Sequence, residues 1–376
     1  MNKKELELYI HIPFCVRKCS YCDFLSAPAT EQTREAYMAA LFAEIGGRAK
    51  DYSDRTVTSI FIGGGTPSLL SGEQIGQLMD RIREQFAMAQ DAEITMEVNP
   101  GTASAEKLRN FYTAGINRLS IGMQSAQAEE LKNLGRIHDF EGFCQVYREA
   151  VEAGFTNINV DIMSGLPGQT LASYRDTLEK VLHLEPMPQH ISAYSLIVEE
   201  GTPFAAMAER GELPLPEEET ERAMYEETIE VLAKYGFHRY EISNYARDGY
   251  ECRHNVGYWI RRDYLGFGIG AASLIDNVRF QNEKSLGAYL AHPLESREEE
   301  QTLTVQDRME ETMFLGLRLT RGVSCVDFAE QYGRTVEEVY GEVIARNVAD
   351  GLLTVTERKE NQKKDRFLAL TKRGLD

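Results

Sequence analysis

The chain has 376 residues, carries a formal net charge of −18 at pH 7, and is 43% hydrophobic. This length allows one large α/β domain with a smaller companion. A surface this acidic repels phosphate backbones, which argues against non-specific nucleic-acid binding. No apolar stretch approaches the roughly 20 residues that a membrane-spanning helix requires. The first residues lack a signal-peptide pattern, so we expect a cytoplasmic protein.

Apolar, β-type runs alternate with amphipathic segments through the first half of the chain. The runs predict strands at 6–12, 57–62, 94–98, 118–123, 157–163 and 191–197, and helix-like stretches lie between them at 34–49, 71–86, 105–114, 140–153 and 171–184. Serial β–α units with buried strands predict a parallel sheet covered by outer helices. Six units fall short of the eight in a closed barrel. We therefore predict an α/β fold with an open, three-quarter (β/α)6 barrel of the TIM type.

The rest of the chain predicts an extension of the barrel and a separate C-terminal domain. We assign 1–210 to the barrel, 211–294 to its extension and 302–376 to the C-terminal domain, with an acidic linker at 295–301. Two or three predicted helices followed by a hairpin at 352–370 indicate a small, winged-helix-like α+β domain. It carries 12 basic and 13 acidic residues, so we do not expect a DNA-recognition helix.

Three of the six cysteines lie together in a short loop after the first predicted strand. Cys15, Cys19 and Cys22 have the spacing C-x3-C-x2-C, whereas the other three are scattered. Thiolates so spaced can each hold one iron of a [4Fe–4S] cluster, leaving the fourth iron open to a bound molecule. Zinc is an alternative and would need a fourth ligand, for which His11 is nearby. Unrelated buried cysteines are a further alternative.

Polar groups follow the ends of successive predicted strands. Residues 63–66 (GGGT) follow the second strand, and their glycines let backbone approach a ligand closely, although a tight turn would also explain them. Glu97, Gln124 and Asp161 lie at the ends of the third, fourth and fifth strands. Each alone could be a structural polar group. Because the C-terminal ends of barrel strands meet at one face, the series predicts a ligand site there.

The order of these motifs resembles one branch of the radical S-adenosylmethionine (SAM) superfamily. YIHIPFCxxxCxYC, GGGTPS, ExNP, IGxQS, LGRxH and GLPGQT follow one another from Tyr9 onward. This order is similar to that of the coproporphyrinogen dehydrogenase-like proteins, which include oxygen-independent coproporphyrinogen III oxidases and the HemW heme chaperones. The resemblance implies a [4Fe–4S] cluster on Cys15, Cys19 and Cys22, with SAM on its open iron. It implies SAM contacts from Tyr9, Gly64, Gly65, Thr66 and Glu97, and contacts with a second SAM from Gln124, Arg136 and Asp161.

Two features separate the oxidases from the chaperones. The oxidases resemble one another in a fourth cysteine two residues after the third and in a long N-terminal arm, whereas this chain has Phe24 at that place and fourteen residues before Cys15. Residues 254–259 (HNVGYW) resemble the HNxxYW signature of the chaperones. The resemblance implies that His254 is an axial heme ligand beside the aromatic Tyr258 and Trp259. A nearby thiol, Cys252, is a rival ligand, and a loop histidine with an aromatic anchor is the structural alternative.

The resemblance favours a heme chaperone that holds heme and a SAM-ligated cluster and delivers heme to acceptor proteins. It implies membrane-bound respiratory acceptors, a peripheral position at the inner face of the membrane, and a homodimer. The alternative is an oxygen-independent coproporphyrinogen III oxidase, a radical SAM decarboxylase of porphyrin biosynthesis. Methyl or methylthio transfer to RNA is disfavoured by the acidic charge. No residue is assigned as catalytic.

Overall fold

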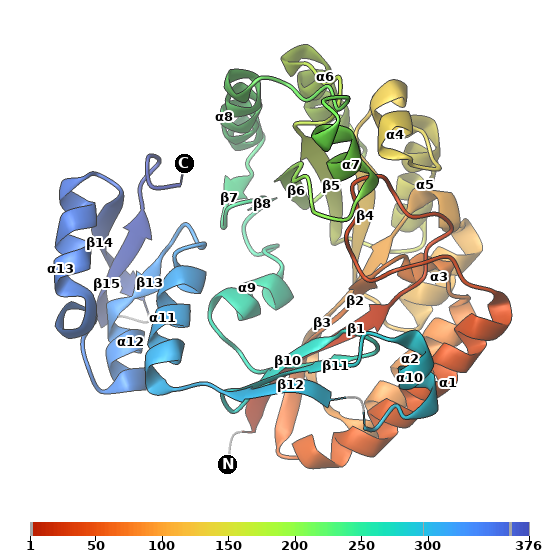
Figure 1. The fold of residues 1–376 in the computed structure, drawn as a ribbon, viewed down its shortest axis with the longest axis horizontal. Coiled ribbons are helices and arrows are strands. Elements are labelled where there is room, and N and C mark those ends of the chain that lie inside the picture. Colours follow the sequence, from red (N-terminus) through yellow and green to blue (C-terminus); the bar gives the residue numbers. More distant parts are fainter. Residues whose placement is uncertain (1–2, 296, 361–362, 376) are drawn as a thin grey trace.

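The computed structural model describes residues 3–295, 297–360 and 363–375. Six parallel strands form the centre of the fold (Figure 1). They are β1 (Lys4–Ile12), β2 (Arg55–Gly64), β3 (Ala87–Val98), β4 (Arg118–Gln124), β5 (Ile158–Ser164) and β6 (His190–Ser195). Each pairs in parallel with the next, and within the described residues the sheet does not close on itself. The predicted open barrel is confirmed.

Helices cover the outer face of these strands. They are α1 (Glu31–Arg48), α2 (Gly72–Gln85), α3 (Ala105–Thr113), α4 (Ala128–Leu134), α5 (Phe140–Glu152) and α6 (Leu171–Leu182), with short 3₁₀ turns at Ala49–Tyr52, Pro67–Leu69 and Pro100–Thr102. Helix α2 illustrates the hydrophobic periodicity from which these helices were predicted. Ser71 and Gln74 form a capping box at its start, and its buried residues are Ile75, Leu78, Met79 and Ile82. That spacing places one apolar stripe against the sheet.

The sheet continues beyond the six strands at both edges. On the β6 side are β7 (His238–Arg239) and β8 (Asn244–Ala246), and on the β1 side are β9 (Tyr264–Phe267), β10 (Ala272–Ile275), β11 (Val278–Asn282) and β12 (Arg297–Thr302). The prediction of a linker at 295–301 is wrong, because most of this segment belongs to β12, which pairs antiparallel with β11. All six side chains of this edge strand are exposed, so its sequence lacks the apolar alternation that marks a half-buried strand.

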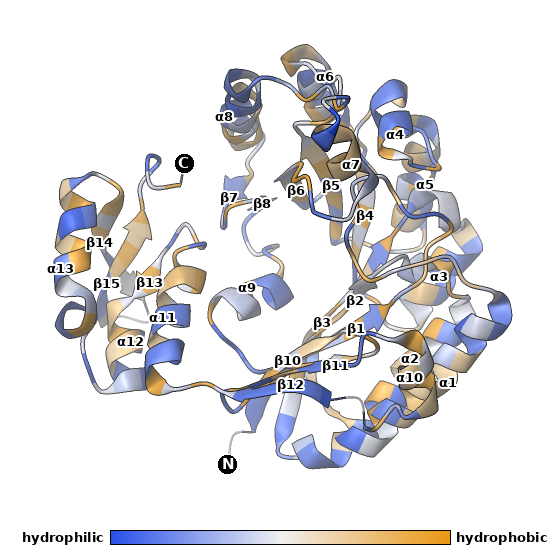
Figure 2. Ribbon diagram, in the orientation of Figure 1, coloured by the Kyte–Doolittle hydropathy of each residue, from blue (hydrophilic) through white to orange (hydrophobic). Residues whose placement is uncertain are grey.

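Four further helices belong to this extended barrel: α7 (Pro203–Glu209), α8 (Glu218–Lys234), α9 (Arg253–Trp259) and α10 (Leu286–Ala291). Figure 2 shows hydrophobic residues concentrated on the barrel strands, with hydrophilic residues on the outer turns of the helices. Helix α8 buries Met224, Thr228 and Leu232 on one side. Among the described residues, no helix has the length and apolar character needed to cross a membrane.

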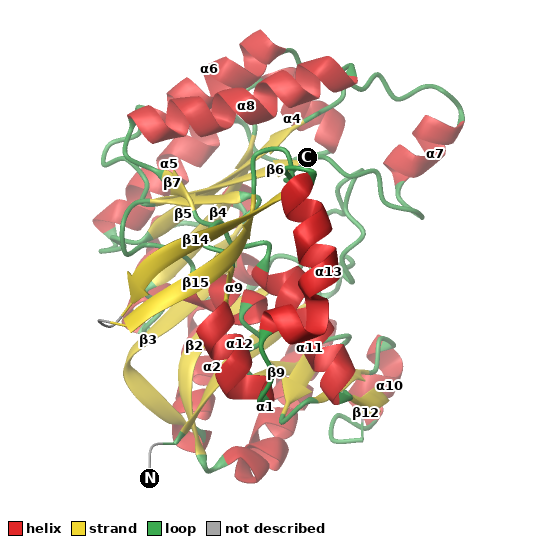
Figure 3. Cartoon of the chain, turned by 90° about the vertical axis from the view of Figure 1, so that its left-hand side faces the viewer, coloured by secondary structure: helices red, strands yellow, loops and turns green. Residues whose placement is uncertain are grey.

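The C-terminal domain has its own small core. Its elements are α11 (Val305–Gly316), β13 (Val323–Ser324), α12 (Cys325–Tyr332), α13 (Val336–Ala349), β14 (Leu353–Glu360) and β15 (Lys363–Leu370). The strands form an antiparallel sheet in the order β13-β15-β14, as the winged-helix-like prediction requires. Its core side chains are Met309, Phe328, Val336, Leu353 and Leu368. Figure 3 shows β14 and β15 in front of the barrel, and Figure 1 places α11 beside α9.

Candidate functional site

The loop that follows β1 holds the three clustered cysteines at one end of the barrel. The Cys15 amide donates to the Ala27 carbonyl (3.2 Å), and the Cys22 amide donates to the Cys19 carbonyl (3.3 Å). All three thiols are partly exposed. The Thr66 hydroxyl donates to the Cys15 sulfur at 3.4 Å, and Arg136 Nη1 lies 3.9 Å from the Cys19 sulfur.

These cysteines line a cavity of about 330 Å³ together with strand-end residues. Among the described residues that line it there is no fourth cysteine and no histidine, the ligands that would complete a structural zinc site. In the described ranges no three His, Cys, Asp or Glu side chains converge as the ligands of one ion would. Each thiolate of a cubane binds a different iron, so its sulfurs need not converge on one point. The donor set therefore fits a cluster with one open iron.

The glycine turn after β2 packs directly against the cluster loop. The Gly64 amide donates to Glu97 Oε2 at 3.0 Å, and the Gly65 amide donates to the Ile12 carbonyl at 2.8 Å. A Cβ on Gly65 would lie 2.7 Å from the Phe14 carbonyl oxygen. Gly64 has φ +108°. Both positions therefore require glycine, and both line the cluster cavity with Thr66.

Two carboxyl groups, Glu97 and Asp161, line the same cavity. Burial, and secondarily the charge of Asp161, raises the pKa of Glu97 to about 8. Burial also raises the pKa of Asp161, against hydrogen bonds from Asn159 (2.7 Å) and Ser120 (3.2 Å). A cationic ligand between the two groups would stabilise their ionised forms. SAM carries an ammonium and a sulfonium group, so its chemistry fits this pair.

Gln124 and Arg136 complete the set of predicted residues in this cavity. Gln124 ends β4 with φ +69°, a left-handed conformation that is uncommon for a residue with a side chain. Such strain concentrates at ligand sites. Arg136 donates through Nη2 to the Gly122 carbonyl at 2.8 Å while its Nη1 reaches Cys19. It therefore links the cluster loop to β4.

Several residues that line this cavity were not predicted from the sequence. They are Asn99, Arg118, Ser120, Asn159, Ser192 and Tyr194. Residues 118, 120, 122 and 124 all face the cavity, as the alternation of side chains along β4 requires. Arg118 is fully buried, and among the described residues its Nε has no hydrogen-bond partner. An arginine at the start of an otherwise apolar strand was the available signal.

A second cavity, of about 580 Å³, adjoins the first, since Phe24, Gly64 and Glu97 line both. Most of its lining is aromatic or aliphatic. The other lining residues are Tyr9, His11, Leu25, Tyr258, Trp259, Arg261, Tyr264, Gly270, Ala272, Leu274, Arg279 and Leu315. The structure thus brings Tyr9 to this larger cavity rather than to the cluster cavity. Its hydroxyl pairs with His11 Nδ1 at 2.9 Å.

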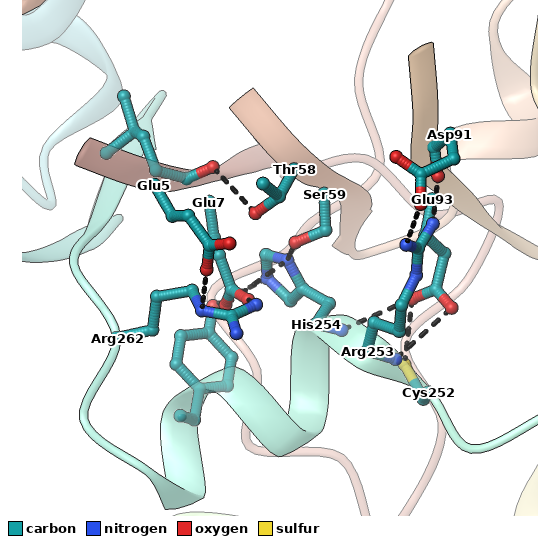
Figure 4. Close-up of polar contacts among 12 residues, drawn as sticks. Glu5, Glu7, Thr58, Ser59, Asp91, Glu93, Cys252, Arg253, His254 and Arg262 are labelled. Carbon is teal, nitrogen blue, oxygen red and sulfur yellow. Dashed lines mark hydrogen bonds and ion pairs between the residues drawn. The ribbon is translucent and has the colours of Figure 1, made fainter. Parts of the chain in front are cut away.

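His254 contacts Tyr258, which lines the larger cavity, but His254 itself is not among the described residues that line either cavity. Its side chain is 1% exposed and stacks on the Phe61 ring. Nδ1 hydrogen-bonds the Ser59 hydroxyl (2.8 Å, Figure 4), and Nε2 hydrogen-bonds the Tyr258 hydroxyl (2.9 Å). Burial lowers the pKa of His254 to about 3, so the ring is neutral. Binding an iron would require one nitrogen to release its present partner.

Cys252 is also withdrawn from both cavities. Its side chain is fully buried, and its thiol donates to Glu93 Oε1 at 3.5 Å. Burial raises the pKa of this thiol to about 12. Tyr258 and Trp259 of the chaperone signature therefore line the larger cavity, whereas the two predicted iron ligands, His254 and Cys252, are not among the described residues that line it.

Carboxylates of the sheet anchor α9, which carries this signature. Glu93 of β3 accepts hydrogen bonds from the backbone amides of Arg253 and His254, both at 3.2 Å (Figure 4). A carboxylate at a helix N-terminus satisfies unpaired amides. On the other side, Arg262 pairs with Glu7 at 3.2 Å. Burial raises the pKa of Glu7 to about 8. These contacts fix the direction in which Tyr258 and Trp259 point.

Comparison with known proteins assigns the chain to a family. Residues 9–181 match the Radical SAM superfamily, and residues 303–376 match the HemN C-terminal domain. The heme chaperone HemW of Bacillus subtilis is 40% identical over 352 residues, covering 92% of each chain. That of Escherichia coli is 37% identical over 358 residues, covering 93% of this chain and 92% of the relative. The chain belongs to the HemW family.

Membership of the HemW family confirms the resemblance inferred from the motifs, and the radical SAM superfamily implies a [4Fe–4S] cluster and SAM. Among solved structures, the radical SAM coproporphyrinogen III oxidase HemN of Escherichia coli has a TM-score of 0.83 at 28% identity. The match covers 98% of this chain and 87% of that chain. The barrel and the C-terminal domain are therefore shared with an oxidase as well as with the chaperones.

Proposed function

We propose that this protein is a heme chaperone of the radical SAM type. It binds heme in the larger cavity, holds a SAM-ligated [4Fe–4S] cluster beside it, and delivers heme to acceptor proteins. One observation carries the proposal: Tyr258 and Trp259 of the family signature line a cavity of about 580 Å³. Small-molecule sites are typically about 300–1,000 Å³. Aromatic side chains suit a flat porphyrin.

The cluster cavity has a distinct task in this proposal. Cys15, Cys19 and Cys22 hold the cluster, and residues 64–66 with Glu97 bind SAM. When bound and reduced by an external electron donor, the cluster would supply one electron to the SAM sulfonium. Arg136 positions the loop through its contact with Cys19, and Asp161 with Gln124 extends the ligand surface along β4 and β5.

His254 serves heme binding by positioning Tyr258, since its ring nitrogens hold Ser59 and the Tyr258 hydroxyl. Direct ligation by His254 or Cys252 is the competing proposal. The two differ in the optical spectrum of bound heme, because loss of an axial ligand changes the electronic environment of the iron.

The second candidate function is oxygen-independent coproporphyrinogen III oxidation, favoured by the similarity to HemN. Phe24 occupies the place where the resemblance to oxidases requires a cysteine, and its ring borders both cavities. Trp259 is the single tryptophan of the chain and provides the test. Hemin should quench its fluorescence, and coproporphyrinogen III should release no carbon dioxide. Carbon dioxide release without quenching would overturn the proposal.

The family resemblance also supports proposals on partners and place of action. We propose that the chain acts in the cytoplasm at the inner face of the membrane, as a homodimer, with membrane-bound respiratory proteins among its acceptors. Because the protein has a net charge of −18, we do not expect anionic lipids to attract it. Recruitment therefore depends on the acceptor, and vesicles without acceptor should not sediment it.

A further inference from the structure

The larger cavity carries positive charge where it meets the C-terminal domain. Arg261 follows α9 and Arg279 lies on β11, and both line the cavity. Arg261 Nε lies 2.9 Å from Glu311 Oε2, and Arg279 Nη2 lies 2.8 Å from Glu311 Oε1. Two guanidinium groups thus share a single carboxylate of α11. The Arg261 side chain is only 3% exposed, so solvent cannot balance its charge.

Two buried donors beside this pair have no hydrogen-bond partner within the described part of the chain. They are Nη2 of Arg261 and Nε1 of Trp259. Buried donors are normally satisfied, and an unsatisfied group is unfavourable unless a ligand or water completes it. Both residues line the larger cavity. A ligand with acceptor oxygens would suit these donors, and the two guanidinium groups favour one that is anionic.

The cations lie on a different side of this cavity from the cluster. Arg261 and Arg279 contact α11, and neither is among the described residues that line the cluster cavity. Phe24, Gly64 and Glu97 form the border with the cluster cavity. Most of the other residues that line the larger cavity are aromatic or aliphatic. This order suits an amphipathic ligand that has a flat apolar body and carboxylates along one edge.

We propose that Arg261 and Arg279 bind the propionate carboxylates of heme, with the apolar edge of the porphyrin toward Phe24. The inference rests on the proposed function and adds the residues and the orientation of binding. Guanidinium groups pair with carboxylates through two parallel hydrogen bonds. In this orientation the propionates point away from the SAM site. Decarboxylation of a propionate would require the opposite orientation, so the two arginines also favour transfer of intact heme.

The test compares hemin with its dimethyl ester, in which both carboxylates are capped. Each is titrated into the full-length, cluster-loaded protein and followed by the Soret band. The variant is Arg279→Gln, because Arg261 still pairs with Glu311 and the domain contact is kept. The control is Arg210→Gln, an exposed arginine that follows α7, pairs with Glu212 and is not among the described residues that line the cavity.

We expect Arg279→Gln to weaken hemin binding about 10- to 100-fold, as for charged hydrogen bonds, and Arg210→Gln to leave it unchanged. The ester should bind wild type and Arg279→Gln equally. Hemin affinity unaffected by Arg279→Gln, or an ester that binds wild type as tightly as hemin does, would overturn the inference while leaving heme binding intact. Absence of any hemin binding to wild type would instead overturn the proposed function on which it rests.

Discussion

The two adjoining cavities are built in different ways. Many polar residues line the cluster cavity, and consecutive strands of one barrel contribute them. Glu97 comes from β3, Gln124 from β4 and Asp161 from β5. The larger cavity is mostly apolar, and it forms where α9 and β11 meet α11 of another domain. Cofactor chemistry thus resides in the fold shared with an oxidase. The proposed heme site depends on how two domains pack together.

The largest effect expected is loss of the cluster on Cys19→Ser. In the proposed site Cys15, Cys19 and Cys22 are the protein ligands of the cluster, so the variant should retain almost no iron or sulfide after anaerobic reconstitution. Cys144→Ser, on α5, is the matched control and should retain both. Since Cys19 does not border the larger cavity among its described residues, hemin affinity should stay within about twofold. Parallel loss of heme binding would show that the cavities are not separate.

Next is His254→Ala, which deprives Ser59 and Tyr258 of their shared partner. We expect a loss of about 2–4 kcal/mol in the free energy of unfolding, measured by denaturant titration. Hemin affinity should fall, but the Soret maximum of bound hemin should not move. Tyr258→Phe, which removes only the hydroxyl, should cost about 1 kcal/mol. A shifted Soret maximum in His254→Ala would identify the histidine as the iron ligand.

Two glycines offer a matched pair. A Cβ on Gly65 would lie within 2.7 Å of Phe14 backbone, whereas at Gly76 of α2 nothing lies within 4 Å. Gly65→Ala should destabilise the protein by about 1–3 kcal/mol and weaken SAM binding in equilibrium dialysis. Gly76→Ala should raise stability by about 0.5–1 kcal/mol, since alanine favours a helix. Equal behaviour of the two would contradict the close packing of the glycine turn.

The smallest effect is the pH dependence from Glu97. In the unfolded chain this carboxyl ionises near its ordinary pKa of 4.5, but in the folded, ligand-free chain only near 8. Between these values the unfolded state binds fewer protons, so wild type loses stability as pH rises, and Glu97→Gln should not. The variant's advantage should grow by about 1 kcal/mol from pH 5 to 8. Exposed Glu84→Gln should show no such trend; parallel curves for wild type and Glu97→Gln would refute the raised pKa.

The barrel and most of the cluster cavity were predictable because each rests on local sequence. Apolar runs in the sequence predicted all six central strands. Because the C-terminal ends of barrel strands share one face, Gly64, Glu97 and Asp161 could be predicted to lie in one site. Arg118 was missed because a charged residue at the start of a strand is usually exposed, whereas this side chain is buried and lines the cavity. Edge strand β12 was missed because all its residues are exposed and polar, so the sequence lacks the apolar alternation that predicts a strand.

The larger cavity could not be predicted in the same way. Arg261, Arg279 and Glu311 come from three separate segments, and only the docking of α11 brings them together. The position of His254 was equally hidden. Its motif resembles a heme-binding signature, but the burial of the ring depends on Ser59 and Phe61 of β2, far away in the chain.

The most direct test of two separate, adjoining sites is a hemin titration of protein that already holds its cluster and SAM. Trp259 fluorescence reports the larger cavity, and the electron paramagnetic resonance spectrum of the reduced cluster reports the smaller one. The account predicts saturable quenching at one hemin per chain, with SAM and cluster retained. Displacement of SAM by hemin, or the absence of quenching, would contradict it.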